Sequence, residues 1–239
     1  MNQRMKRAYT GLCMAIIGCV CVSAQQVPVE DYLKQAGYHA EIYNGKVEKI
    51  YNTGIYKNLP YYRSADFTEA AVTYRGNYFP NQKARIDLYR EQLIIVPPGK
   101  QYPIAVGFAN TEKIEIYGKT FIGLTPPKES KLVSGYYIRL LKGREMQLLC
   151  KERYTPQKSL QQDRVVYYFD HEKRYYLKYN NRYHPVKNKG SFSKIFPQYK
   201  KQINKFLKEH KLDFKQNPDE SLTALTGYCE ELINSTNTP

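Results

Sequence analysis

Two carboxyl groups stand out as residues that could do chemistry together. Asp87 and Glu91 lie four residues apart, within and just after the alternating stretch "KARIDLY". Glycoside hydrolysis needs only two such groups at a suitable separation across a cleft. This pair makes a glycan-directed hydrolase one functional hypothesis. We favour the simpler interpretation, in which Asp87 pairs with Arg85 or a cross-strand base on a solvated sheet face.

Other catalytic and metal-binding patterns are absent from the sequence. The histidines, His39, His171, His184 and His210, include no pair three to five residues apart, and there is no His-Glu-x-x-His, Cys-x-x-Cys or Gly-x-Ser-x-Gly. We therefore predict no metal site, no cofactor and a function that leans away from catalysis.

Lysines dominate "FPQYKKQINKFLKEHKLDFKQ", residues 196–216. At 100° per residue the apolar side chains share one arc and the lysines another, which predicts an amphipathic helix. The lysine arc is either the solvated face of a surface helix, which we favour, or a contact with anionic lipid or lipopolysaccharide phosphate. The candidate polyanion contacts are Lys200, Lys201, Lys205 and Lys208.

Tyrosine is unusually frequent, with 24 Tyr against 9 Phe and no Trp. Tyrosine can stack on a sugar ring, and Arg63 or Arg75 nearby could hold an acidic glycan. Neighbouring residues of a strand point to opposite faces, however, so one ring of each adjacent pair belongs to the core and the other points outward. We favour a structural use. The adjacent pairs are at 61–62, 136–137, 167–168 and 175–176.

Short apolar runs broken by Gly, Asn and Pro predict strands joined by hairpins. Asn44-Gly45, in "EIYNGKVEKIY", is the clearest type I′ turn signal, because both residues tolerate positive φ. We expect an antiparallel β-meander of about eight to ten strands, forming a sandwich or a partly open barrel. Similar turn signals follow at Arg75-Gly76, Tyr117-Gly118, Lys142-Gly143 and Asn180-Asn181.

Two C-terminal α-helices should close one face of this sheet. The first is the lysine-rich helix. The second begins at Asn217-Pro218-Asp219-Glu220, which combines an N-cap, a proline at the first helical position and early acidic residues. Its predicted core-facing side chains are Leu222, Leu225, Cys229, Leu232 and Ile233.

The N-terminus has the pattern of a signal peptide. Arg4, Lys6 and Arg7 precede an uncharged apolar run over 11–22. Cleavage is predicted after Ala24. A lipobox-like alternative would instead acylate Cys19. We expect an exported protein of the periplasm, outer-membrane surface or extracellular space, or alternatively a lipoprotein.

After the 1–24 signal peptide, 25–239 should form one domain, with a β-rich body over 38–188, a helix pair over 191–235 and no transmembrane segment. Removing the signal lowers the formal net charge from +15 to +12. Such charge favours polyanions, and export argues against nucleic acid. Cys150 and Cys229 could form a disulfide or remain buried thiols.

Two stretches, 42–95 and 174–214, contain "IYNGKVEKIY", "ARIDLY" and the lysine-rich segment. They resemble a family of secreted proteins of unknown activity that is common in Bacteroidota, with its "LYNGK", "GxPY"-like and "YDLY"-like segments. Residues 58–61 lack the glycine of the second motif, and 86–89 lack the first tyrosine of the third. The resemblance implies export and a shared fold, without an activity.

The leading functional hypothesis is a non-enzymatic, envelope-associated binding or structural protein whose basic surface meets anionic glycans or lipid headgroups. A glycan-directed hydrolase and a small-ligand carrier are the alternatives.

Overall fold

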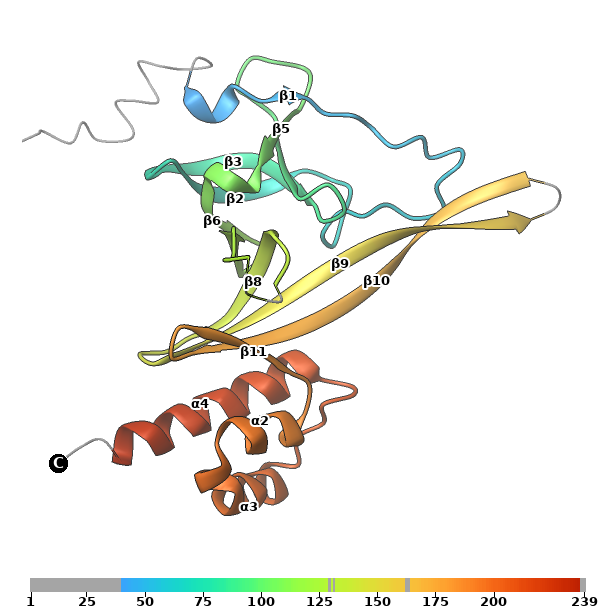
Figure 1. Cartoon of the computed structure of the whole chain (residues 1–239). Helices are drawn as coiled ribbons and strands as arrows, with labels where there is room; N and C mark the ends of the chain where they lie inside the picture. Colours follow the sequence, from blue (N-terminus) through green and yellow to red (C-terminus); the bar gives the residue numbers. More distant parts are fainter. Residues whose placement is uncertain (1–39, 129, 131, 162–163, 237–239) are drawn as a thin grey trace, which may run out of the picture.

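A computed structural model of the chain describes residues 40–128, 130, 132–161 and 164–236 (Figure 1). Eleven antiparallel strands form one sheet in the order β1-β5-β4-β3-β2-β6-β7-β8-β9-β10-β11. The strands are β1 (Lys46–Val47), β2 (Thr68–Tyr74), β3 (Asn77–Asp87), β4 (Gln92–Ile95), β5 (Ile104–Gly107), β6 (Thr111–Ile116), β7 (Lys119–Leu124), β8 (Gly135–Lys142), β9 (Met146–Gln161), β10 (Arg164–Tyr179) and β11 (Arg182–Val186). The helices are α2 (Lys189–Ile195), α3 (Lys200–His210) and α4 (Pro218–Thr236), with short 3-10 turns η2 (Glu41–Tyr43), η3 (Phe108–Asn110) and η4 (Pro197–Tyr199).

The predicted antiparallel meander followed by C-terminal helices is confirmed. The sheet is open, so the partly open alternative holds and the sandwich does not, and it has one strand more than the upper end of the expected range. Both expected helices are present as α3 and α4, and the short helix α2 precedes them.

Three of the predicted turns have the backbone that a tight hairpin requires. Both residues have positive φ, which matches the right-handed twist of the strands that they join. The turns are Arg75-Gly76 (48° and 77°), Tyr117-Gly118 (51° and 67°) and Asn180-Asn181 (48° and 57°).

Gly143 also lies in a hairpin loop, between β8 and β9, but the lack of a side chain is required there for a different reason. Its φ is not positive. A Cβ there would collide with the carboxylate of Glu230 on α4. The Oε1 atom of Glu230 accepts a hydrogen bond of 2.8 Å from the backbone of Glu145 in the same loop. The glycine thus leaves room for the contact that attaches α4 to this hairpin.

The predicted Asn44-Gly45 hairpin is wrong. Asn44 ends the 3-10 turn η2 with φ −90°, and β1 pairs with β5 rather than with the preceding segment. A Cβ on Gly45 would lie 2.5 Å from the carbonyl oxygen of Ala105. The glycine allows the backbone to approach β5 closely, a second role that the dipeptide does not distinguish from a turn.

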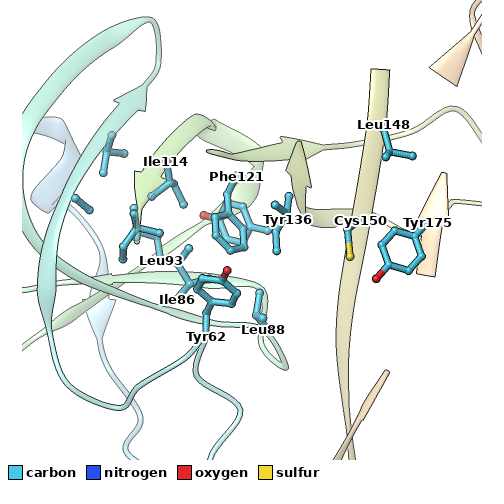
Figure 2. Packing of buried hydrophobic residues seen from close by; sticks show 14 of the residues in the cluster. Tyr62, Ile86, Leu88, Leu93, Ile114, Phe121, Tyr136, Leu148, Cys150 and Tyr175 are labelled. Atoms are coloured by element: carbon cyan, nitrogen blue, oxygen red, sulfur yellow. The ribbon is translucent and has the colours of Figure 1, made fainter. Parts of the chain in front are cut away.

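The main hydrophobic core is continuous from the first strands to the last helix. Figure 2 shows Tyr62, Ile86 and Leu93 around Phe121, with Leu148 and Cys150 farther along toward Tyr175. Side chains of α4, among them Leu225, complete the cluster. The two halves of the sheet therefore share one core.

Residues 51–62, hereafter the strap, run across the open side of the sheet. At one end the backbone N–H of Lys57 donates to Tyr167 O on β10 (2.8 Å). The side-chain amide of Asn58 bonds both backbone groups of Phe169 (2.7 and 2.9 Å). At the other end Tyr61 bridges to Asp87 of β3. The strap thus joins β10 to β3 where no ladder closes the sheet.

The helices form a layer beyond the sheet, with α4 packed on β8 and β9 and α3 packed mainly on α2 and α4 (Figure 1). Phe206 of α3 stacks on Tyr228 of α4, with ring centroids 4.1 Å apart. The expectation that both helices sit on the sheet is therefore wrong for α3. Its apolar stripe faces inward as predicted, with Ile203 fully buried and Leu207 partly buried.

We expect Gly45→Ala to lower the free energy of unfolding by about 1–3 kcal/mol, because the added methyl group overpacks against a backbone carbonyl that cannot rotate away. Gly107→Ala, where a Cβ meets nothing within 4 Å, is the matched control and should change it by less than about 0.5 kcal/mol. Urea unfolding measures both, and equal effects would contradict the close-approach explanation.

Candidate functional site

Asp87, the last residue of β3, is fully buried beneath the strap. The hydroxyl of Tyr51 donates to its Oδ2 (2.7 Å), and the backbone N–H groups of Tyr89 and Arg90 donate to its Oδ1 (3.0 and 2.8 Å). Burial raises the pKa of Asp87 although these donors oppose the shift. Both oxygens have protein donors, so these contacts favour a structural role over a catalytic one.

The predicted solvated face and Asp87–Arg85 pair are wrong. The guanidinium of Arg85 lies 2.6 Å from the Oε2 atom of Glu48 and stacks over the ring of Tyr61 (4.2 Å to the centroid). The Tyr61 hydroxyl donates to the Oε1 atom of the same glutamate (2.7 Å). The nearest cation to Asp87 is instead Arg90, at 3.7 Å. Charges at this end of β3 are thus buried and paired with the strap and the residues just before it.

Glu91, the second candidate acid, is half-buried and forms an ion pair with the buried Lys151 of β9. Its Oε1 lies 2.5 Å from the Lys151 Nζ, and its Oε2 accepts from the Tyr136 N–H (2.6 Å). Lys151 also donates to the Tyr136 carbonyl (2.9 Å), and only 3% of its side chain is exposed. Burial raises the pKa of Glu91 and lowers that of Lys151, while the attraction between them opposes both shifts.

This ion pair crosses a large part of the sheet. Four strands separate β3 from β9 in the strand order, yet the turn after β3 contacts β9 directly. The sheet is therefore strongly curled. Gly135 leaves room for the pair, because a Cβ there would overlap the Glu91 carboxylate. A pocket of about 240 Å³ lies beside the pair. No local pattern in the sequence pointed to Lys151 as a partner of Glu91.

The four candidate lysines, Lys200, Lys201, Lys205 and Lys208, are all exposed on α3, the helix farthest from the sheet (Figure 1). Among the described residues only Lys205 has a carboxylate partner, Glu209 at 3.9 Å, and that pair is itself exposed. Residues 187–215 contain nine lysines and two acidic residues. The lysine face defined by these four residues is thus almost uncompensated.

A groove of about 660 Å³ lies where β10, β11 and the start of α4 meet, and we call it the tyrosine groove. Its apolar lining comes from segments far apart in the sequence, and cations stand beside it. The apolar lining residues are Leu132, Tyr175, Tyr176, Tyr183, Pro185, Val186, Phe214 and Pro218, and the cations are Lys173, Arg174 and Lys187.

The polar wall of the tyrosine groove is formed by Tyr175 and Lys173, whose polar contacts are made with Asp219 and Glu152 outside the lining. The Tyr175 hydroxyl donates to Asp219 Oδ1 (2.6 Å), and Lys173 Nζ lies 3.2 Å from both Asp219 Oδ2 and Glu152 Oε1. His171 Nε2 contacts the second oxygen of Glu152 (2.9 Å). Burial lowers the pKa of Lys173, but the two carboxylates outweigh burial and raise it above its usual value. This wall therefore has little hydrogen-bonding capacity left for a ligand.

Two of the four tyrosine pairs, 136–137 and 175–176, alternate between sheet faces as predicted, but both rings of each pair are buried. Tyr136 lies in the main core and Tyr137 in a second cluster on the opposite face. Tyr175 and Tyr176 divide in the same way. The expectation that one ring of each pair points outward is wrong here, because both sheet faces are covered at these positions. Nine of the described tyrosines are buried, which supports a structural use of those side chains.

Cys150 and Cys229 are free, buried thiols in the main core. Burial raises the pKa of both, that of Cys229 to about 12. His210 is exposed and stacks on Phe206 at 4.0 Å. Within the described ranges, no group of three or more His, Cys, Asp or Glu side chains could hold a metal ion.

Several predictions concern residues outside the described ranges, namely cleavage after Ala24, lipidation of Cys19 and the position of His39. Among the helices of the described part of the chain, none is long and apolar enough to cross a membrane.

Comparison with known proteins found no matching family model, no matching curated protein and no matching solved structure. The resemblance to a secreted Bacteroidota family stays a prediction.

Tyr51→Phe should destabilise the protein by about 1.5–3 kcal/mol at pH 7, because buried ionised Asp87 loses a donor. Losing that donor raises the Asp87 pKa further. A raised carboxyl pKa means that protonation favours the folded state, so the defect should shrink as the pH falls through that pKa. Urea unfolding at several pH values tests this. Tyr56→Phe, whose hydroxyl has no hydrogen bond in the described structure, is the control and should show neither effect.

In the native protein, Cys150 and Cys229 should resist iodoacetamide at pH 8, because burial restricts access and disfavours the thiolate. Unfolding in urea without reductant should make both alkylate. Peptide mass spectrometry measures each site separately. Recovery of a disulfide-linked peptide containing both residues would contradict the free-thiol arrangement.

Proposed function

We propose that this protein is a non-catalytic binding protein of the cell envelope that contacts polyanions through the lysine face of α3. Its partners are anionic envelope glycans or lipid headgroups, which share phosphate, sulfate or carboxylate groups.

The observation that carries this proposal is the lack of compensation on α3. Lys200, Lys201 and Lys208 have no carboxylate partner among the described residues, and the Lys205 pair is solvent-exposed and weak. Each lysine near an anionic surface contributes about 1 kcal/mol of attraction. Four lysines on one helix face could therefore supply about 4 kcal/mol through charge alone, roughly half of the binding free energy of a micromolar affinity.

The position of α3 supports the same function. The helix packs through Ile203 and Phe206 on α2 and α4, so its apolar stripe is already used and its lysines point away from the core. A helix held in this way contacts a surface through charge rather than by inserting its apolar face. Binding should therefore depend strongly on salt.

The test is binding to lipopolysaccharide and to a sulfated polysaccharide, measured at about 50 and 500 mM salt, since screening removes exposed charge interactions over this range. Lys201→Gln/Lys205→Gln should weaken binding at low salt by about 2 kcal/mol, or roughly thirtyfold. Lys142→Gln/Lys158→Gln, an equal loss of charge on the sheet, is the control. Salt-independent binding, or equal losses in the two double variants, would overturn the proposal. If the Lys201→Gln/Lys205→Gln variant loses binding to only one of the two polyanions, that polyanion identifies whether the natural partner is a lipid headgroup or a glycan.

A further inference from the structure

The tyrosine groove differs in chemistry from the lysine face. Its lining is largely apolar and includes the rings of Tyr176, Tyr183, Phe214 and Pro218. A volume of about 660 Å³ is within the range of sites that hold small ligands. An apolar ligand entering it would gain roughly 25 cal/mol for each Å² of apolar surface removed from water.

The polar wall of the groove limits which ligands fit. Tyr175, Asp219 and Lys173 already satisfy one another, with contacts of 2.6 and 3.2 Å. A sugar placed against this wall would lose hydrogen bonds from its hydroxyl groups to water without gaining replacements from Tyr175, Asp219 or Lys173, which is costly. A hydrocarbon chain has no hydrogen bonds to lose. The groove therefore suits a chain better than a glycan.

The cations at the rim of the groove favour a ligand that carries a negative charge. Lys187 is exposed, lines the groove and has no carboxylate partner among the described residues. Arg174 also lines the groove, and its carboxylate partner among the described residues is the exposed Glu172, at 3.0 Å. An anionic group at the mouth would thus meet one unpaired ammonium and one weakly engaged guanidinium.

We propose that the tyrosine groove binds the acyl chain of a single-chain anionic amphiphile and that Lys187 and Arg174 hold its carboxylate or phosphate. The ligand class is a free fatty acid or a lysophospholipid, which share this chemistry. The inference goes beyond polyanion binding by α3 and can hold or fail independently of it.

The experiment is calorimetric titration of the full chain with four probes, each below its critical micelle concentration. Laurate and lauroyl lysophosphatidate carry both chain and charge, dodecyl maltoside carries the chain without charge, and glycerol 3-phosphate carries the charge without a chain. We expect laurate or lauroyl lysophosphatidate to bind at least about tenfold more tightly than dodecyl maltoside, and glycerol 3-phosphate not to bind measurably. The tighter of the two anionic probes identifies the headgroup.

Two variants assign the site. Tyr183→Ala removes a ring from the wall and should weaken binding of both anionic probes about tenfold. Lys187→Glu reverses the rim charge and should weaken the same probes about tenfold while leaving dodecyl maltoside within about twofold. Lys158→Glu makes the same charge change near the C-terminal end of β9, away from the groove lining, and is the matched control. Because Lys187 is exposed, its variant keeps the test valid if Tyr183→Ala fails to fold.

The proposal is overturned if neither anionic probe binds, if Lys187→Glu and Lys158→Glu weaken binding equally, or if folded Tyr183→Ala binds like wild type. Competition by a sulfated oligosaccharide that Tyr183→Ala abolishes would also overturn it, because the groove would then be a glycan site. Lys201→Gln/Lys205→Gln separates the two proposals, since it should impair polysaccharide binding and leave laurate binding within about twofold.

Discussion

Contacts across the open side of the sheet hold this fold in its curled shape. A closed barrel would achieve this with a continuous ladder of backbone hydrogen bonds. Here the Glu91–Lys151 ion pair and the strap take its place, and both depend on buried charge. Removing one partner of a buried pair leaves the other without compensation, which is far more costly than losing an exposed pair. The shared core and the position of the helices on β8 and β9 both follow from this curl.

The two surfaces that could bind ligands are both on the helical side of the molecule, but they arise from different physical causes. The lysine face exists because α3 packs on other helices and, among the described residues, its four lysines have a single carboxylate partner, Glu209. The tyrosine groove exists because β11 ends at Val186, while β10 continues beside the start of α4. One surface is charge without a cavity, and the other is a cavity with charge only at its rim. A lipid could engage both kinds of surface, whereas a glycan suits the first.

Features that depend on neighbouring residues were predictable from the sequence, and those that depend on distant ones were not. Arg75-Gly76 and the apolar stripe around Ile203 follow from local backbone preference and helical periodicity. The same local rule failed at Gly45, because a glycine also serves where another backbone comes close. Glu91 and Lys151 are 60 residues apart, and the tyrosine groove joins segments around 132, 175, 185 and 214. Sequence spacing carries no information about such long-range contacts. The sequence therefore identified Asp87 and Glu91 as candidates, but neither the partner Lys151 nor the tyrosine groove.

The strap has a consequence for the order in which the chain acquires its structure. Asn58 finds its partner Phe169 only 111 residues later in the sequence. During synthesis from the N-terminus, the early hairpins β2–β3 and β3–β4 can form from local contacts, whereas the aromatic side chains of the strap must wait for β10 to emerge. Closing so long a loop carries an entropic penalty that local contacts do not repay, which slows folding. The curled architecture therefore becomes complete only when most of the polypeptide is available, and we expect the strap to be among the last parts to gain protection from hydrogen exchange.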